Sequence, residues 1–323
     1  MMRAVVCKAL GPFDNVAVEQ VDSPSVGPGQ VLVAVRAAGV NYVDGLMCQG
    51  RYQIKFPTPY VPGGEIAGDV LAVGEEVSGL FAAGDRVMAL TGFGAFCEQM
   101  AIHSASLVKM PDVLSYAQGA TMIQSYATAL YALKRANLRE GEKVLALGAG
   151  GGIGLAAVDV AVALGASVVA AASSAAKLSA AVAVGAGGTI AYEDEDLKVR
   201  ARQISGGGVD VVIDPVGGDK SEAALRALRS FGRLCVIGFT AGIGSVPLNQ
   251  VLLSNRSVIG IDWGAWAASD PPGNRKLIEE LVTMVSAGKL HPAVPAERPL
   301  EDATQVMDDL LERRTVGKVV LVP

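Results

Sequence analysis

Apolar residues along this chain follow two different patterns, which change near residue 120. The first part contains short apolar runs separated by glycine and proline, at residues 30–40, 64–74 and 84–90. Runs of this length, bounded by turn-forming residues, are typical of β-strands. The pattern therefore predicts a β-rich domain over residues 1–120.

Beyond residue 120, apolar runs alternate with helical segments. The runs that predict strands are residues 143–148, 167–172, 188–192, 209–216, 232–239 and 257–262. Residues 195–204 and 221–230 lie between such runs and predict connecting helices. Alternating strands and helices favour a doubly wound parallel sheet of about six strands, so the expected fold class is α/β.

The last part of the chain predicts two more helices, at residues 274–288 and 301–314, and a final strand at 317–323. We expect residues 264–323 to complete the first domain. The doubly wound domain is then expected to span residues 121–263. No flexible linker is evident, so the two domains are expected to share a cleft that holds ligands.

The most informative segment is residues 143–178, where a strand, a glycine-dense turn, a helix and a second strand follow in order. The turn residues are Ala149, Gly150, Gly151, Gly152, Ile153 and Gly154. Peptide N–H groups and the positive end of the following helix can face a pyrophosphate there. Gly151 and Gly152 are expected to supply torsional freedom and close approach, and Gly154 to let the helix pack tightly on the strand.

This turn predicts a dinucleotide-binding site. Ala149 stands where the first glycine of the G-x-G-x-x-G pattern would be, so that pattern is incomplete. An ordinary tight strand-to-helix turn is the alternative.

The residues after the second strand indicate which dinucleotide is bound. A free ribose 2′-hydroxyl is usually held by an acidic residue about 20 positions beyond the glycines. Between Asp159 and Glu193 the chain has no Asp or Glu, and Ser173, Ser174 and Lys177 follow the second strand. Hydroxyls and an ammonium suit a 2′-phosphate, which favours NADPH over NADH. Alternatively, Ser173 caps the next helix and Lys177 is merely solvated.

Composition narrows the range of functions. With 323 residues, of which 51% are hydrophobic, the chain can fill two cores. The net charge of −5 and the absence of a basic cluster argue against nucleic acid as a partner. Four cysteines without C-x-x-C spacing and two histidines fit neither a disulfide framework nor a structural zinc cluster.

Nothing in the pattern predicts a membrane location. The apolar stretch at 144–172 is interrupted by Asp159 and by glycines, as expected for buried strands and helices rather than a membrane span. The first ten residues show no apolar core of a secretory signal, so a cytoplasmic location is expected.

Several segments together carry a family resemblance. They are residues 37–52, 62–87, the loop at 149–154, and 209–239. The chain resembles the zinc-free quinone oxidoreductase branch of the medium-chain dehydrogenases/reductases, in particular its quinone oxidoreductase-like members. This resemblance implies a GroES-like catalytic domain, a Rossmann domain that binds NADPH, and a homodimer paired through the edge strand Ser257 to Trp263.

The resemblance also assigns roles to individual residues. Asn41 is expected near the nicotinamide ribose and the substrate, and Tyr52 is expected in the pocket as a hydrogen-bond or proton donor. Further cofactor contacts are implied for Thr128, Lys177, Tyr192, Phe239 and Arg314. Alternatives remain open: Asn41 forms a turn, Tyr52 and Thr128 only pack, and Arg314 is an exposed arginine at a helix end.

No metal is expected. Zinc-dependent relatives place a cysteine and a histidine where this chain has Asn41 and Gly64, although Glu65 remains. The implied function is metal-free hydride transfer from NADPH to a quinone or an α,β-unsaturated carbonyl (enone). The alternatives are an enoyl-thioester reductase, acting on a CoA or carrier-protein thioester, and a cofactor-binding protein without turnover.

Overall fold

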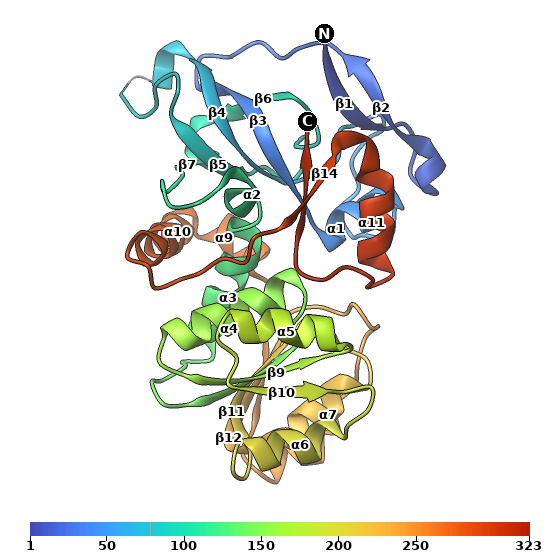
Figure 1. The fold of residues 1–323 in the computed structure, drawn as a ribbon, viewed down its shortest axis with the longest axis vertical. Coiled ribbons are helices and arrows are strands. Elements are labelled where there is room, and N and C mark those ends of the chain that lie inside the picture. Colours follow the sequence, from blue (N-terminus) through green and yellow to red (C-terminus); the bar gives the residue numbers. More distant parts are fainter. Residues whose placement is uncertain (78) are drawn as a thin grey trace. The chain divides into compact units, whose positions relative to one another are not determined.

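The chain divides into two units, each with its own sheet (Figure 1). The computed structural model describes residues 1–77 and 79–323. The first unit comprises Met1–Gln124 and Val294–Pro323, and the second comprises Ser125–Ala293.

The second unit is built on a parallel sheet with strand order β10-β9-β8-β11-β12-β13. Its strands are β8 (Lys143–Leu147), β9 (Ser167–Ala172), β10 (Gly188–Ala191), β11 (Val209–Asp214), β12 (Leu228–Val236) and β13 (Ser257–Gly260). The helices assigned to it are α3 (Ile123–Arg135), α4 (Gly152–Ala163), α5 (Ala175–Ala183), α6 (Leu197–Ile204), α7 (Lys220–Ala227), α8 (Leu248–Leu252), α9 (Trp263–Ser269) and α10 (Pro271–Ser286). The order places β8 beside β11, where the direction of winding reverses, and ligands of such sheets bind at this point.

Both faces of this sheet are covered by helices (Figure 1). Leu145 and Leu147 of β8 join one buried cluster with Leu197 of α6 and Leu225 of α7. The alternate residues of β8 point to the opposite face, on which α4 packs. Because both faces are buried, the central strands β8 and β9 are apolar at every position after the first, which is why the pattern of apolar runs located them.

The boundaries of the second unit correct the expected ones. Residues 264–293 were expected in the first domain, but they belong to the second unit. The reason is their packing: the ring of Trp266 stacks on that of Tyr131 in α3, with centroids 4.5 Å apart, and Lys134 of α3 pairs with Glu280 of α10. The expected edge strand also ends earlier, at Gly260, because Trp263 begins α9.

The first unit is β-rich, as expected, and contains two sheets in its described residues. A larger sheet has the order β14-β15-β3-β4-β5-β7, with β6 paired to β3, and β1 pairs with β2. The strands are β1 (Met2–Cys7), β2 (Val16–Val21), β3 (Gln30–Val40), β4 (Glu65–Val73), β5 (Arg86–Leu90), β6 (Gln99–His103), β7 (Leu107–Lys109), β14 (Ala296–Pro299) and β15 (Val319–Val322). Its helices are α1 (Tyr42–Cys48), α2 (Tyr116–Gly119) and α11 (Ala303–Leu311), with short 3₁₀ turns η1 (Phe13–Asn15), η2 (Glu75–Val77), η3 (Ser104–Ser106) and η4 (Leu300–Asp302).

The C-terminal strand completes the first unit. β15 pairs with the end of β3 in antiparallel register, with Val319 opposite Val40. Residues nearly 280 positions apart in sequence are thereby brought together at the end of β3, where α1 begins. The expected fold class, a doubly wound parallel sheet plus a β-rich GroES-like domain, is confirmed.

Candidate functional site

The glycine loop of the second unit connects β8 to α4 and approaches its own backbone closely. A Cβ atom added at Gly154 would lie 2.2 Å from the carbonyl oxygen of Gly148, so only glycine fits there. Gly151 is the N-cap of α4, and the first turn of that helix contains no acidic residue. The positive end of α4 is therefore open to an anion, as a pyrophosphate site requires.

One expectation about this loop needs correction. Torsional freedom was assigned to Gly151 and Gly152, but neither has a positive φ, and Gly151 has φ −100°. The left-handed residue is Gly148, with φ 56°, one position before Ala149. The chain therefore turns as the strand ends, and the later glycines Gly150 and Gly154 serve close packing instead.

The end of β9 brings hydroxyls and an ammonium beside the loop. A Cβ atom at Gly150 would lie 2.3 Å from Cβ of Lys177, so the stem of this lysine lies against the loop. Lys177 Nζ donates to Ser173 Oγ over 3.2 Å. Ser174, rather than Ser173, caps α5 by accepting from the Lys177 amide at 3.4 Å. The capping alternative thus applies to Ser174 and leaves Ser173 exposed beside a cation.

Tyr192 and Phe239 follow other strands of the same sheet. Tyr192 comes directly after β10, and Nζ of Lys220 lies 5.3 Å from the centroid of its ring. Phe239 follows β12 and is half exposed. Thr128 lies within α3 and is buried, which agrees with the packing alternative.

Asp214 shapes the turn after β11. The side chain is fully buried and accepts from the amides of Val216 and Gly217, both at 2.9 Å, and from Ser221 Oγ at 2.6 Å. A Cβ atom at Gly217 would lie 3.1 Å from the Phe239 ring, so this turn lies against the loop after β12. The segment 209–239 is recognisable in the sequence, whereas the hydrogen bonds by which Asp214 holds its turn depend on the tertiary structure.

In the first unit, Asn41 belongs to a buried polar cluster with Asp44, Glu65 and Lys318. Asn41 caps α1, and its backbone N–H donates to Asp44 Oδ2 over 2.7 Å. Its side-chain Nδ2 lies 3.5 Å from Glu65 Oε2, and Lys318 Nζ donates to its Oδ1. The turn predicted as an alternative role for Asn41 is present, but its side chain also has two polar neighbours, Glu65 and Lys318.

Burial sets the electrostatics of this cluster. Asp44 is 2% exposed and Glu65 is fully buried. Burial raises the pKa of Asp44 to about 7, although the hydrogen bond from the Asn41 backbone N–H and the charge of Lys318 oppose this change. Burial likewise raises the pKa of Glu65 and lowers that of Lys318.

The side chains at the expected zinc positions do not form a zinc ligand set. Only Glu65 is a strong ligand, and its Oε1 accepts from the Gln124 amide at 3.0 Å. Asn41 turns its oxygen toward the Lys318 ammonium, a cation that would repel a metal ion. A Cβ atom at Gly64 would lie 3.2 Å from the backbone of Gly92, so a ligand side chain there would require a shift.

Tyr52 and Arg314 are also in the first unit. Tyr52 follows α1 and is half-buried. Arg314 follows α11 and pairs with Asp308 at 2.6 Å and with Asp309 at 2.8 Å. These contacts agree with the helix-end alternative for Arg314, which would have to leave both carboxylates to reach a phosphate.

The expected site residues therefore fall into two groups, one on each unit. The structure adds Lys318, Asp44, Asp214 and Lys220 to them. Their sequence signals were weak, because single charged residues within apolar strands or beside helix ends acquire meaning only through partners far away in the chain.

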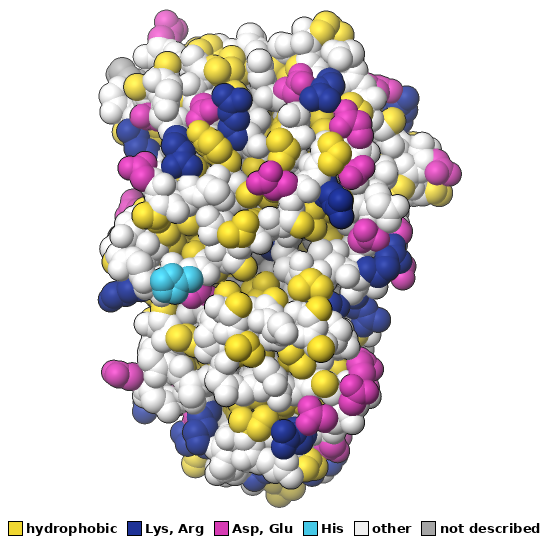
Figure 2. All heavy atoms as spheres, viewed as in Figure 1, with side chains coloured by type: hydrophobic (Ala, Val, Ile, Leu, Met, Phe, Trp, Pro, Cys, Tyr) yellow, Lys and Arg dark blue, Asp and Glu magenta, His cyan; other side chains and the backbone are white. Residues whose placement is uncertain are grey.

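The surface and the helices bear on possible partners. On the face seen in Figure 2, basic and acidic side chains are interspersed, without a broad region of one sign. Across the part of the chain that the structure describes, every helix is too short or too polar to cross a membrane.

Two family models match the chain. The alcohol dehydrogenase GroES-like domain matches residues 27–112, and the zinc-binding dehydrogenase family matches residues 152–281. The matched ranges lie in the first and second units, respectively.

Known proteins are similar over almost the whole chain. Quinone oxidoreductase-like protein 2 homolog of Nematostella vectensis is 36% identical over 99% of this chain and 88% of the relative. Quinone oxidoreductase-like protein 2 of Mus musculus is 37% identical over 99% of this chain and 91% of its own length. Among solved structures, Escherichia coli quinone oxidoreductase complexed with NADPH is 27% identical, with a TM-score of 0.88 over 99% of this chain and 100% of that one.

Proposed function

Because the chain belongs to the quinone oxidoreductase family of the medium-chain dehydrogenases/reductases, we propose that it transfers hydride from NADPH to a quinone or an α,β-unsaturated carbonyl without a metal. The family consists of oxidoreductases that act on small molecules. The NADPH dependence, the acceptor class and the metal-free reaction are the proposal.

The arrangement at the end of β9 is the observation that carries the choice of cofactor. Ser173 and Lys177 form a hydroxyl and ammonium pair beside the glycine loop. Both can donate hydrogen bonds to a 2′-phosphate, and the ammonium offsets its charge. A 2′-hydroxyl would find no carboxylate between Asp159 and Glu193. The E. coli relative, whose structure contains NADPH, supports the same choice.

The other residues would bind and orient the reactants. The amides of Gly150 to Gly154 and the positive end of α4 would hold the pyrophosphate. Thr128, Tyr192 and Phe239 would contact the rest of the cofactor. Bound NADPH would supply the hydride. Asn41 would donate a hydrogen bond where negative charge develops on the acceptor oxygen, and Tyr52 would deliver a proton.

A metal is unnecessary in this scheme. A zinc ion in related chemistry would polarise a carbonyl oxygen as a Lewis acid. Here hydrogen-bond donors of the protein, Asn41 and Tyr52, would stabilise that oxygen instead. The residues Asn41, Gly64 and Glu65 do not form a zinc ligand set, which supports a metal-free reaction.

Coenzyme titration with a Lys177→Ala variant tests the proposed cofactor. By calorimetry, the wild-type chain should bind NADPH more tightly than NADH. Removing the ammonium should weaken the binding of NADPH by about tenfold and that of NADH much less, since only NADPH has the 2′-phosphate. Lys198→Met, an exposed lysine on α6, is the matched control. Equal losses for both coenzymes would remove Lys177 as the phosphate contact.

Turnover separates the acceptor classes. NADPH absorbance should fall with a quinone or an enone and not with a crotonyl thioester. Oxidation only with the thioester would instead favour an enoyl-thioester reductase. Tight NADPH binding with no oxidation by any acceptor would favour a binding protein.

We also propose that the chain forms a homodimer through the edge of the second unit. β13 is the edge strand of its sheet. On the neighbouring α8 and just beyond it, Leu248, Leu252 and Leu253 are 79%, 76% and 74% exposed. An unpaired edge strand, preceded in the chain by exposed leucines, is the kind of surface that a second copy would cover.

A further inference from the structure

Lys318 is brought to Asn41 by strand register. Val319 of β15 pairs with Val40 of β3 in antiparallel register, so Lys318 lies across from Asn41 at the end of both strands. Its Nζ donates to the carbonyl oxygen of Val40 at 2.9 Å and to Asn41 Oδ1. The ammonium thus contacts both the backbone and the side chain at the point where β3 ends.

The charges on the two sides of the Asn41 amide determine its orientation. Its oxygen faces the Lys318 ammonium, and its Nδ2 faces the Glu65 carboxylate at 3.5 Å. A flipped amide would point its oxygen at the carboxylate and its N–H groups at the ammonium, losing both hydrogen bonds. Asn41 is only 6% exposed, so water cannot readily replace these partners.

One hydrogen of this amide is left for a ligand. Oδ1 accepts from Lys318, and one Nδ2 hydrogen is directed at Glu65. The second Nδ2 hydrogen has no partner among residues 1–77 and 79–323. In this orientation, Asn41 therefore offers a ligand a donor rather than an acceptor.

We propose that Lys318 is a positioning residue that holds Asn41 as a hydrogen-bond donor toward the acceptor oxygen. This inference rests on the proposed hydride transfer. It assigns a second task to a cation that also offsets the buried Glu65 and Asp44 carboxylates. Those two tasks predict different results when Lys318 is replaced.

A double-mutant cycle distinguishes positioning from charge compensation alone. Lys318→Met should lower kcat by about tenfold in the wild-type background, because the amide is released, and change it by less than about twofold in an Asn41→Ala background. The KM for NADPH should change little in both backgrounds. Equal losses in the two backgrounds would overturn the proposal. Lys8→Met, an exposed lysine paired with Glu19 in the same unit, is the control.

A readout independent of turnover follows the amide itself. In protein with isotope-labelled asparagine, the Asn41 side-chain NMR signal is identified by its loss in Asn41→Asp. That signal should shift in Lys318→Met and stay unchanged in Lys8→Met. An unchanged signal in Lys318→Met would overturn the proposal, even if no acceptor supports turnover and the proposed function itself fails.

A variant that balances the charges guards against misfolding. If Lys318→Met does not fold, the Lys318→Met/Glu65→Gln pair removes one charge of each sign and takes its place in both measurements. The positioning role predicts a shifted Asn41 signal and a reduced kcat here too. Wild-type values in this pair would show that only charge compensation mattered.

Discussion

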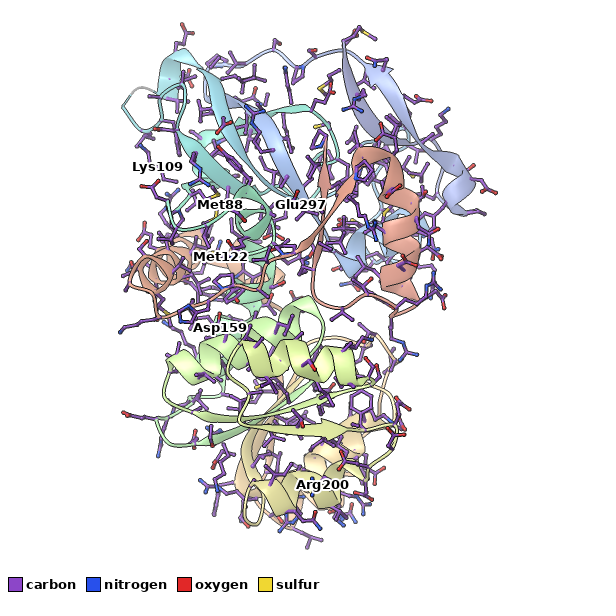
Figure 3. All side chains as sticks on the ribbon, in the orientation of Figure 1. Met88, Lys109, Met122, Asp159, Arg200 and Glu297 are labelled. Atoms are coloured by element: carbon purple, nitrogen blue, oxygen red, sulfur yellow. The ribbon has the colours of Figure 1, made fainter. Side chains whose placement is uncertain are left out.

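At the residue scale, Asp159 shows how a buried carboxylate can be retained within an apolar helix. It lies in α4 (Figure 3). Its exposed fraction is only 3%. Its Oδ2 accepts from the hydroxyl of Tyr126 and from the amide of His291, both at 2.8 Å. Burial raises the pKa of Asp159, although these hydrogen bonds oppose that change. The carboxylate joins α3, α4 and the segment after α10, all within the second unit.

Replacing Asp159 should separate the role of hydrogen bonding from that of charge. Asp159→Ala leaves the buried Tyr126 hydroxyl and the partly buried His291 amide unpaired and should lower the free energy of unfolding by about 2 kcal/mol, whereas Asp159→Asn keeps an acceptor and should cost less. Urea unfolding of the three proteins measures this difference. Equal losses in both variants would show that the hydrogen bonds contribute nothing.

The same variants give a pH dependence of known sign. A pKa that is higher in the folded state than in the unfolded state means that folding favours the protonated carboxyl. The stability of the wild type relative to Asp159→Asn should therefore fall as pH rises above the unfolded pKa of about 4, and be greatest in acid. A difference that grows with pH would contradict the raised pKa.

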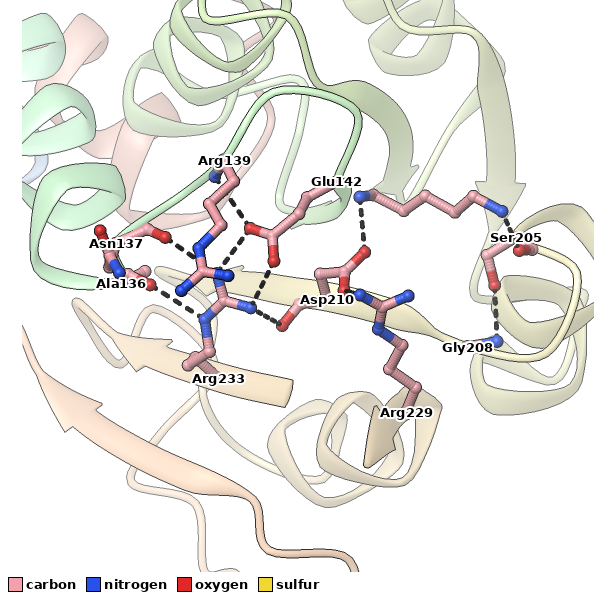
Figure 4. Close-up of polar contacts among 10 residues, drawn as sticks. Ala136, Asn137, Arg139, Glu142, Ser205, Gly208, Asp210, Arg229 and Arg233 are labelled. Atoms are coloured by element: carbon pink, nitrogen blue, oxygen red, sulfur yellow. Dashed lines mark hydrogen bonds and ion pairs between the residues drawn. The ribbon is translucent and has the colours of Figure 1, made fainter. Parts of the chain in front are cut away.

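At the element scale, Arg233 joins three segments at the amino ends of the parallel strands (Figure 4). From β12, it pairs with both oxygens of Glu142, at 3.0 and 2.6 Å, just before β8. Its Nε donates to the carbonyl oxygen of Ala136, just after α3, at 2.9 Å. The two side chains are only 16% and 14% exposed, so water screens this pair weakly.

Breaking this pair should destabilise the second unit. Arg233→Met leaves a mostly buried carboxylate unpaired and should cost about 3 kcal/mol in unfolding free energy. Arg226→Met removes a more exposed pair with Glu222 on α7 and should cost less than about 1 kcal/mol. Denaturant unfolding of both variants provides the comparison, and similar losses would show that burial does not strengthen the Arg233 pair.

The Arg233 pair also predicts an acid effect. Burial alone would raise the pKa of Glu142, but hydrogen bonds from Arg233 prevail and hold it below 4.5. This stabilisation is present above the unfolded pKa and is lost as pH falls through the folded one. Arg233→Met should therefore differ less from wild type in acid than at neutral pH.

At the scale of the whole molecule, the proposed dimer depends on one exposed edge. Leu252→Glu would place a charge among the exposed leucines without filling a core position, since this residue is 76% exposed. Light scattering should give twice the chain mass for the wild type and the single chain mass for the variant. Val113→Glu, 67% exposed in the first unit, should leave the wild-type mass unchanged.

Two results would contradict the dimer. A monomeric wild type would exclude a stable dimer at the concentration measured. A dimer that persists in Leu252→Glu would place the interface on another surface.

Much of the fold could be read directly from the chain. Buried parallel strands are mainly apolar and glycines lie at the turns, so the order of strands and helices and the loop at 149–154 were predictable. The domain boundary was harder to place, because α10 has the same amphipathic pattern whichever domain it packs on. The contact of Trp266 in α9 with Tyr131 and the pair of Glu280 in α10 with Lys134 place these helices in the second unit.

Some parts of the candidate site were likewise predictable from the sequence, and others were not. The sequence alone identified the glycine loop, the serines and lysine after β9, and the lack of an acidic residue there. These features lie close together in the chain, so no tertiary contact is needed to find them. The tertiary structure alone decided that Gly148 carries the left-handed turn and that Lys318 contacts Asn41. The sequence is silent on that contact because it arises from strand register across almost the whole chain, and register is set by packing rather than by any short motif.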